Sequence, residues 1–174
     1  MTHARNPGLP LTTDWFDRVQ VNRPAAERRA ATLTTRRSVK KEHQAAWLVN
    51  AIRCTDLTTL AGDDTPGNVH RLVAKAITPL RQDILEALGM GDQTLHVGAV
   101  CVYHSRIQDA LDALNGVDIP IAAVSTGFPA GQSPYKQRIE EIHESVAAGA
   151  KEIDIVISRE HVLRGDWGYS GGVG

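Results

Sequence analysis

The sequence predicts an α/β protein built on a parallel sheet. Four short apolar runs of strand type, at 54–60, 95–103, 119–129 and 152–158, alternate with segments whose apolar residues recur at helical spacing. Such alternation is typical of strand–helix–strand units, which produce parallel neighbours. The runs are apolar at nearly every position, as expected for strands buried on both faces. A (β/α) barrel and a flavodoxin-like sheet both fit this pattern.

Two nucleotide-binding folds are disfavoured by the loops between these elements. No G-x-G-x-x-G fingerprint follows the first strand, which argues against a dinucleotide-binding domain. No G-x-x-x-x-G-K-[ST] loop of the kind that cradles nucleotide phosphates occurs in the chain.

Each helix expected between the strands carries its own start or stop signal. After the first strand, Thr65 is the expected N-cap and Pro66 the first helical residue. The next helix is expected to stop at Gly116, and the third to open at Pro134 and close at Gly149. The apolar residues that align on one face of these helices are Val69, Leu72, Val73, Ala76, Ile107, Ala110, Leu111, Leu114, Ile139, Ile142 and Val146.

A helical extension is expected at 15–52, after a disordered lead-in at 1–14. Its basic run at 21–40 is of a kind that can bind nucleic acid or direct localisation. Glu27 and several threonines dilute the charge, so we interpret the run as a solvated helix face. The segment at 41–52 repeats apolar residues at helical spacing and predicts a second helix.

Charge and composition exclude several classes of function. The 174 residues allow one domain with a real core. A net charge of -1, from 19 Lys+Arg and 20 Asp+Glu, offers no attraction for nucleic acid or an anionic membrane. No apolar run reaches the ~20 residues of a membrane helix, and the first residues lack the apolar segment of a signal peptide. We therefore expect a cytoplasmic protein, with the nucleus as an open alternative.

The two cysteines, Cys54 and Cys101, form neither a disulfide framework nor a C-x-x-C metal site. We expect both to be reduced thiols of an intracellular protein.

An acid stands in the middle of the fourth apolar run. Alternation places the three isoleucines of 152–158 on one face, expected against helices, and Asp154 on the other. On the first strand, Asp56 and Thr58 share a face with Cys54. A buried carboxylate is costly unless it is paired or hydrogen-bonded. Two acids on matching faces of neighbouring strands therefore favour a functional site over a buried polar network. The residues expected beside Asp154 on its face are Glu152, Val156 and Ser158.

Four segments, in order along the chain, resemble successive strands and loops of deoxyribose-phosphate aldolase. They are CTDLTTLAGDDT, AVCVYHSRI, VSTGFPAGQSPYKQRIEEI and GAKEIDIVI. The segments VNRPAAERRA and PLRQDILEALGM resemble the eukaryotic form of that family. The resemblance covers about residues 15–167 and implies a TIM-type (β/α)8 barrel. On this reading, 53–167 form a partial barrel of about four βα units behind the helical extension.

The resemblance implies a class I aldolase, an aldehyde-lyase of deoxyribonucleotide catabolism. Such an enzyme reversibly cleaves 2-deoxyribose 5-phosphate through a Schiff base on a lysine, with no cofactor and no metal. By motif match, Asp154 is the aspartate of the proton relay. Asp56 and Thr58 match polar positions that line the substrate cavity, and Cys101 matches a cysteine near the site. A role for Cys101 as a small core residue is an equal alternative. The implied partners are a phosphorylated sugar and further copies of the chain in a homo-oligomer.

The imine-forming lysine is the point where the resemblance breaks. The family carries it on a later strand, in a segment of the type KTSTG, and no such segment occurs here. Residues 168–174, GYSGGVG, also depart from the family and are expected to be an unrelated Gly-rich tail after a truncation. We therefore expect the chain to be inactive alone. The lysines present are Lys40, Lys41, Lys75, Lys136 and Lys151.

Two other functions stay open on the sequence. One is a non-catalytic half-barrel that associates with itself or with the full-length enzyme through its strand edges. The other is a flavodoxin-like domain, which would bind a flavin.

Overall fold

The computed structural model describes residues 12, 14 and 18–167. The chain divides into two units, one made of Met1–Ser38 with Glu160–Gly174 and the other of Val39–Arg159. The sheet and the helices that pack on it belong to the second unit. The lead-in predicted at 1–14 and the tail predicted at 168–174 lie outside the described residues, apart from positions 12 and 14.

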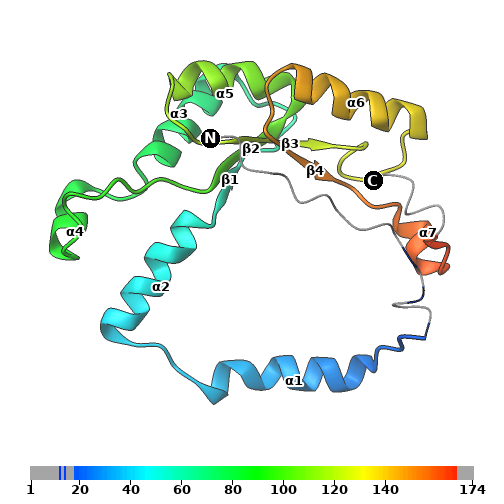
Figure 1. Ribbon diagram of the computed structural model, residues 1–174, viewed down its shortest axis with the longest axis horizontal. Helices are drawn as coiled ribbons and strands as arrows, with labels where there is room; N and C mark the ends of the chain where they lie inside the picture. The colour runs from blue at the N-terminus through cyan, green and yellow to red at the C-terminus, as the bar shows by residue number, and fades with distance from the viewer. Residues whose placement is uncertain (1–11, 13, 15–17, 168–174) are drawn as a thin grey trace. The chain divides into compact units, whose positions relative to one another are not determined.

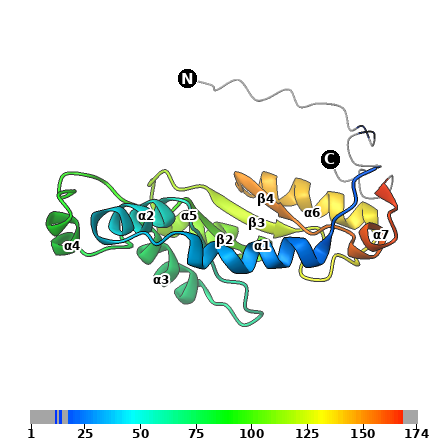
Figure 2. The ribbon, with the colours of Figure 1, turned by 90° about the horizontal axis from the view of Figure 1, so that it is seen from below.

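A four-stranded parallel sheet forms the centre of the second unit (Figure 1). Its strands lie in sequence order, and every neighbouring pair is parallel. Figure 2 gives the view from below, in which β2, β3 and β4 lie side by side. A doubly wound sheet reverses its strand order, so the sequential order confirms the barrel-type prediction and argues against the flavodoxin-like one. The strands are β1 (Asp56–Thr58), β2 (Ala99–Tyr103), β3 (Ile121–Ser125) and β4 (Glu152–Ile155).

Three helices cover one face of this sheet: α3 (Pro66–Ile77), α5 (Ile107–Leu114) and α6 (Tyr135–Ala147) (Figure 1). The main core lies between them and the strands, because the apolar stripes of α3 and α5 meet the side chains that β2 and β3 direct toward the helices. We call the opposite side of the sheet the inner face. The buried members of the main core are Val69, Val73, Ala76, Val97, Val100, Val102, Ile107, Ala110, Leu114, Ile119, Ile121, Ala123 and Ala150.

The helix boundaries follow the predicted local signals. The Thr65 side chain accepts a hydrogen bond from the Asn68 N–H at 3.3 Å, and Pro66 is the first helical residue of α3. Helix α5 ends where Asn115 and Gly116 adopt φ values of 47° and 88°. Gly149, with φ 108°, stands just after α6. These positions confirm the expected caps, since left-handed backbone is what ends a helix in this way.

The alignment predicted along α6 is wrong at its end. Ile139 and Ile142 are half-buried, but Val146 is 54% exposed. At the end of α6 the buried position is taken by Ser145, whose hydroxyl contacts His104 Nδ1 at 3.1 Å.

Helix α2 (Lys41–Arg53) precedes β1 as predicted, and its Val49 joins Leu85 and Leu95 in a small apolar cluster. Leu85 belongs to α4 (Gln82–Ala87), a helix that the sequence pattern did not predict, because six residues are too few to show a helical period. A short 3-10 turn, η2 (His104–Arg106), links β2 to α5.

Helix α1 (Arg23–Arg36) lies in the first unit and buries none of its residues, which confirms the solvated face predicted for the basic run. The same unit contains most of α7 (Arg159–Leu163). Within residues 12, 14 and 18–167, no helix has both the length and the apolarity to cross a membrane.

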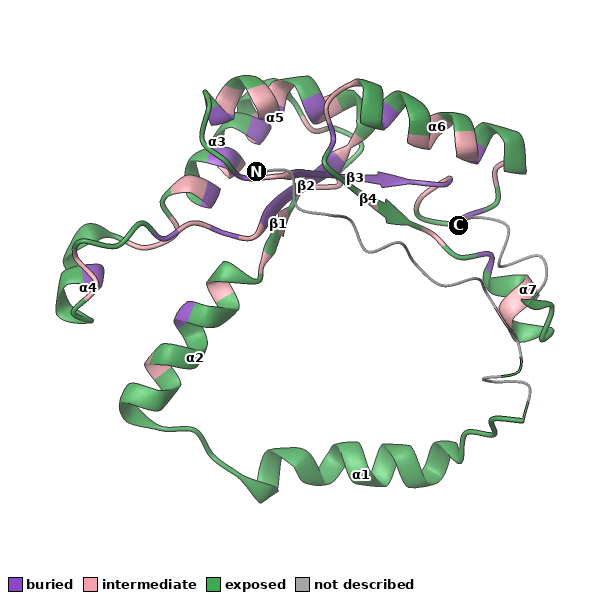
Figure 3. Ribbon diagram, viewed as in Figure 1, coloured by how far each residue is buried: buried purple, intermediate pink, exposed green. Residues whose placement is uncertain are grey.

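Burial separates the two central strands from the two edge strands (Figure 3). All five residues of β3 and four of the five in β2 are buried, whereas β1 and β4 contain no buried residue. The isoleucines of the fourth run were expected to pack on helices. Ile153 does so, but Ile155 and Ile157 are 45% and 54% exposed. The prediction fails there because β4 is the outermost strand of the described sheet, so helices reach it from one side only.

Candidate active site

Strand pairing brings the four predicted site residues onto the inner face. Asp56 is in register with Ala99, Thr58 with Cys101, and Asp154 with Val124. Paired residues of a parallel ladder direct their side chains to the same side of the sheet. These three partners form, together with Ala122, an apolar cluster that is separate from the main core.

The registers also set the height of each side chain along the strands. Thr58, Cys101, Ala122 and Glu152 fall in one row across the sheet. The next row toward the carboxyl ends contains Tyr103, Val124 and Asp154. Asp154 therefore stands near the carboxyl end of β4, the end of barrel strands at which catalytic groups gather. Its side chain is exposed to solvent.

The two predicted acids are not on neighbouring strands. Asp56 belongs to β1 and Asp154 to β4, so β2 and β3 lie between them. Three strand spacings of ~4.8 Å separate the two edge strands by about 14 Å. The sequence pattern showed that both acids share a face, but the strand order decides their separation. They consequently flank the inner face instead of forming a carboxylate pair.

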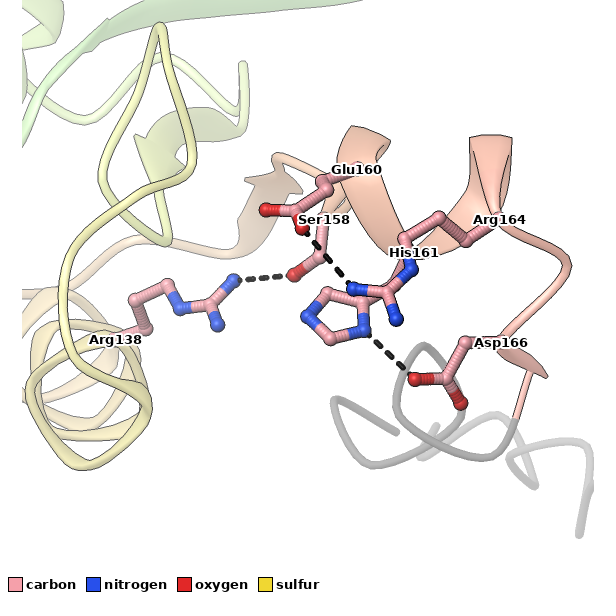
Figure 4. Close-up of polar contacts among 6 residues, drawn as sticks. All are labelled: Arg138, Ser158, Glu160, His161, Arg164 and Asp166. Carbon is pink, nitrogen blue, oxygen red and sulfur yellow. Dashed lines mark hydrogen bonds and ion pairs between the residues drawn. The ribbon is translucent and has the colours of Figure 1, made fainter.

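Ser158 does not share the face of Asp154, contrary to the prediction. It is buried, and its hydroxyl accepts a hydrogen bond from Arg138 Nη1 at 2.9 Å (Figure 4). Arg138 belongs to α6, so Ser158 is turned toward the helices. The alternation of faces was extrapolated past Ile155, where the ladder ends and the backbone no longer has to alternate.

Cys101 lies at the centre of the inner face and is buried. Burial raises the pKa of its thiol, and the negative charges of Asp154, Asp56 and Glu152 raise it further, while a hydrogen bond with the Thr58 side chain opposes them. The thiol is therefore neutral near pH 7. These properties suit a packing residue and do not suit a nucleophile.

Two aromatic residues on the inner face were not given a site role by the sequence pattern. The rings of Tyr103 and Phe128 meet edge to face, with centroids 5.9 Å apart and planes at 68°. Together with Leu60 they pack against the cluster around Cys101. Alternation along β2 was the available signal, because it places Tyr103 on the same side as Cys101.

No lysine of the chain is buried in a strand. All five are exposed, and only Lys151 adjoins the sheet. Its backbone N–H donates to the Ile121 carbonyl oxygen at 2.9 Å, which puts it at the amino end of β4, away from the end that bears Asp154. Among the described residues there is also no group of three or more His, Cys, Asp or Glu side chains placed to hold a metal ion.

Sequence comparison finds mammalian aldolases among the proteins that this chain resembles. The chain is 52% identical over 166 residues to the deoxyribose-phosphate aldolases of Bos taurus and Homo sapiens. It is 54% identical over 167 residues to that of Mus musculus. The chain is a relative of deoxyribose-phosphate aldolase. These matches cover 94% or 95% of the chain, which spans 52% of the length of each aldolase. No family model matches the chain.

Solved aldolase structures share the fold at low sequence identity. A putative deoxyribose-phosphate aldolase from Toxoplasma gondii ME49 matches with a TM-score of 0.56 and 15% identity, over 75% of this chain and 44% of its own. The structure described as QR15, an aldolase, matches with a TM-score of 0.51 and 19% identity, over 68% of this chain and 45% of its own. At these identities the likeness establishes the barrel-type fold over part of each aldolase, and the sequence matches carry the relationship.

Proposed function

We propose that this chain supplies the Asp154-bearing strands of a deoxyribose-phosphate aldolase. The enzyme would reversibly cleave 2-deoxyribose 5-phosphate to acetaldehyde and glyceraldehyde 3-phosphate. The observation that carries the proposal is the position of Asp154, in register with Val124 near the carboxyl end of β4 and on the inner face. The identity of 52% or more to mammalian deoxyribose-phosphate aldolases supports the same substrate. The proposed setting is deoxyribonucleotide catabolism in the cytoplasm, a reducing compartment that suits two free thiols.

The proposed role of Asp154 is to move protons during imine chemistry. When an amine adds to the substrate aldehyde, the resulting carbinolamine loses water only if a proton reaches its hydroxyl group. When the imine is hydrolysed, a proton must leave the attacking water. A carboxyl group can perform both steps in turn, and the protonated imine between them accepts the electrons of the broken carbon–carbon bond.

Asp56 and Thr58 have a different proposed role, because they lie on the opposite edge strand. We assign them to the wall of the substrate cavity, where their oxygens can accept or share hydrogen bonds with sugar hydroxyls. Cys101 lies between the two edges and is neutral, so we assign it to packing under the substrate.

We also propose that none of the five lysines of this chain supplies the imine-forming amine. All five are exposed, whereas a lysine becomes a good nucleophile when it is desolvated in an apolar pocket or lies next to another positive charge. Borohydride reduction of the 174-residue chain with acetaldehyde should give only low labelling scattered over several lysines. A stoichiometric adduct on one lysine, lost on unfolding, would contradict this assignment.

A chimera tests the proposed activity. This chain would replace the segment that it matches in the Bos taurus aldolase, so that the remaining half comes from a known enzyme. We expect the folded chimera to cleave 2-deoxyribose 5-phosphate. Asp154→Asn should lower kcat by roughly 100- to 10,000-fold, the usual cost of losing a general acid–base group. The matched control is Asp118→Asn, an exposed aspartate outside the strands, which should leave kcat unchanged. A folded chimera without activity, or an undiminished Asp154→Asn variant, would refute the proposal.

A second candidate function, a non-catalytic module that associates through its strand edges, is favoured by the exposure of Ile155 and Ile157 beside the unpaired edge of β4. Sedimentation analysis of the 174-residue chain distinguishes the two. A discrete, concentration-stable dimer supports a module, whereas a monomer removes the case for one.

A further inference from the structure

The hydrogen-bonded ladder between β3 and β4 ends before the last contact between the two chain segments. Its last register pairs Ser125 with Ile155. At Thr126 the backbone turns into the left-handed region, with φ 58°, and leaves the sheet for the loop that starts at Gly127. The main chain of β3 therefore contributes no ladder partner to Val156, the residue that follows β4.

The hydroxyl group of Thr126 takes over this pairing. The Val156 N–H donates to Thr126 Oγ1 at 2.5 Å. The single hydroxyl proton lies within reach of two carbonyl oxygens, that of Ser125 at 2.7 Å and that of Val156 at 3.2 Å. Thr126 is fully buried and Val156 is half-buried, so loss of the hydroxyl would leave the Val156 N–H without this partner at a cost in free energy.

The loop after β3 reinforces the same contact. Gly131 has φ 69°, and a Cβ atom there would lie 2.8 Å from Val156 Cγ1, so only a glycine lets the loop backbone approach this closely. Its N–H donates to the Gly127 carbonyl oxygen at 2.8 Å, and the Gly127 N–H donates to Glu141 Oε2 on α6 at 3.0 Å. The loop is thus bound to α6 at one end and rests on β4 at the other. We call Thr126, Gly131 and Val156 the β4 clamp.

The left-handed backbone of Thr126 is energetically unfavourable. A β-branched residue with positive φ is a genuine outlier, because its Cβ crowds the carbonyl oxygen. Such strain persists only where the surroundings enforce it, and it concentrates at functional sites. Asp154 lies on β4, two residues before Val156. Since β4 is an edge strand of the described sheet, the clamp holds the chain where the ladder ends, and the hydrogen bond from Arg138 to Ser158 holds it further on.

We propose that Thr126 is a positioning residue for Asp154. Its hydroxyl group holds the C-terminal end of β4 in place and so fixes the position of the Asp154 side chain relative to the substrate. The catalytic part of this inference rests on the proposed aldolase function, whereas the structural part does not. Misplacement of a reacting group by about 1 Å can cost on the order of 100-fold in rate, so a small displacement of β4 is enough to matter.

Hydrogen exchange at the Val156 amide of the 174-residue chain tests the structural part. Thr126→Val keeps the shape of the side chain but removes the hydroxyl, and should speed exchange at Val156 at least about tenfold relative to the Ala123 amide of β3. Thr126→Ser keeps the hydroxyl and should exchange like the parent. The matched control is Ser125→Ala, which removes an adjacent, fully buried hydroxyl whose oxygen has no hydrogen-bond partner among the described residues; it should leave Val156 unchanged. If Thr126→Val does not fold, Thr126→Gly removes the hydroxyl without the strain and should show the same faster exchange.

The chimera tests the catalytic part. Thr126→Val should lower kcat at least about tenfold with KM within twofold. Thr126→Ser should restore kcat. Because kcat is expressed per folded molecule, a smaller folded population cannot produce the loss. Unchanged exchange at Val156, or an active chimera in which Thr126→Val keeps the parent kcat, would overturn the proposal. A chimera that folds but lacks activity would refute the aldolase function alone, because the exchange result stands by itself.

Discussion

Strands β3 and β4 are neighbours in the sheet, yet they have opposite environments. Every residue of β3 is buried, whereas β4 buries none of its residues and exposes Ile155 by 45% (Figure 3). β3 has a strand on each side and helices over one face, while β4 has a single strand neighbour in the described sheet. An apolar run therefore predicts a strand well, but the burial of that strand depends on what lies beside it.

The residues that stabilise the fold and the residues proposed for catalysis also lie on different strands. The central strands contribute residues to the main core and contain the buried residues of the cluster around Cys101, whereas the acids proposed for the site, Asp56 and Asp154, stand on the edge strands. A carboxylate on an edge strand keeps access to water and avoids the desolvation cost that it would meet between β2 and β3. Substitutions in the centre should accordingly affect folding first, and substitutions at the edges should affect catalysis first.

Paired isoleucine truncations give the largest expected difference between centre and edge. Ile121 on β3 and Ile155 on β4 are directed to the same face of the sheet. Ile121→Ala should lower the free energy of unfolding by roughly 2–5 kcal/mol, because it leaves a cavity in a fully buried site. Ile155→Ala should cost less than about 1 kcal/mol. Urea unfolding of both variants measures the difference, and equal losses would show that Ile155 is covered in solution.

The two thiols extend the comparison to reactivity. Cys54, just before β1, is exposed, and Cys101, on β2, is buried with a raised pKa. A raised pKa leaves less thiolate at a given pH, so the alkylation of Cys101 should begin only above the pH of an ordinary thiol, ~8.5. At pH 8 we expect iodoacetamide to modify Cys54 at least about tenfold faster than Cys101. Peptide mapping over a pH series measures both rates; similar rates would mean that the sheet opens readily at β2.

Helix caps give the smallest effect and test whether the comparison holds away from the strands. Thr65 caps α3, which buries Val69, Val73 and Ala76 against the sheet. Thr65→Ala should lower the free energy of unfolding by about 1 kcal/mol. Asn22 caps α1, accepting from the Ala25 N–H at 3.1 Å, and α1 buries no residue. Asn22→Ala should therefore leave the urea midpoint unchanged, and a shift equal to that of Thr65→Ala would contradict this view of α1.

Local patterns in the sequence were enough to predict the order of the four strands, the helices that cover them, and the caps of those helices. The positions of Thr65, Pro66, Gly116 and Gly149 are decided by backbone chemistry within a few residues, so they can be seen without tertiary information. The face of each acid also followed from alternation along its strand, as the registers of Asp56 and Asp154 show.

Other features depended on contacts that no local pattern contains. The separation of Asp56 from Asp154 follows from the strand order, and the exposure of Ile155 follows from its place at the edge of the sheet. Ser158 turned toward Arg138 once the ladder had ended. The role of Thr126 could not be predicted, because a threonine in an apolar run is typical of an ordinary strand. Its left-handed backbone depends on the loop and on β4.

Helix α1 makes a distinct contribution to how the protein responds to heat. Its 14 residues rely on local interactions, among them the Asn22 cap and an exposed ion pair between Arg23 and Glu27 at 2.6 Å. Isolated helices of about this length are marginal in water and lose order progressively instead of at one temperature. Part of the circular dichroism at 222 nm should therefore decline gradually from low temperature, well before the sheet unfolds in a single transition. A melting curve of this protein would have a steep native baseline that reports α1, and a fit that ignores this slope would underestimate how sharply the sheet itself unfolds.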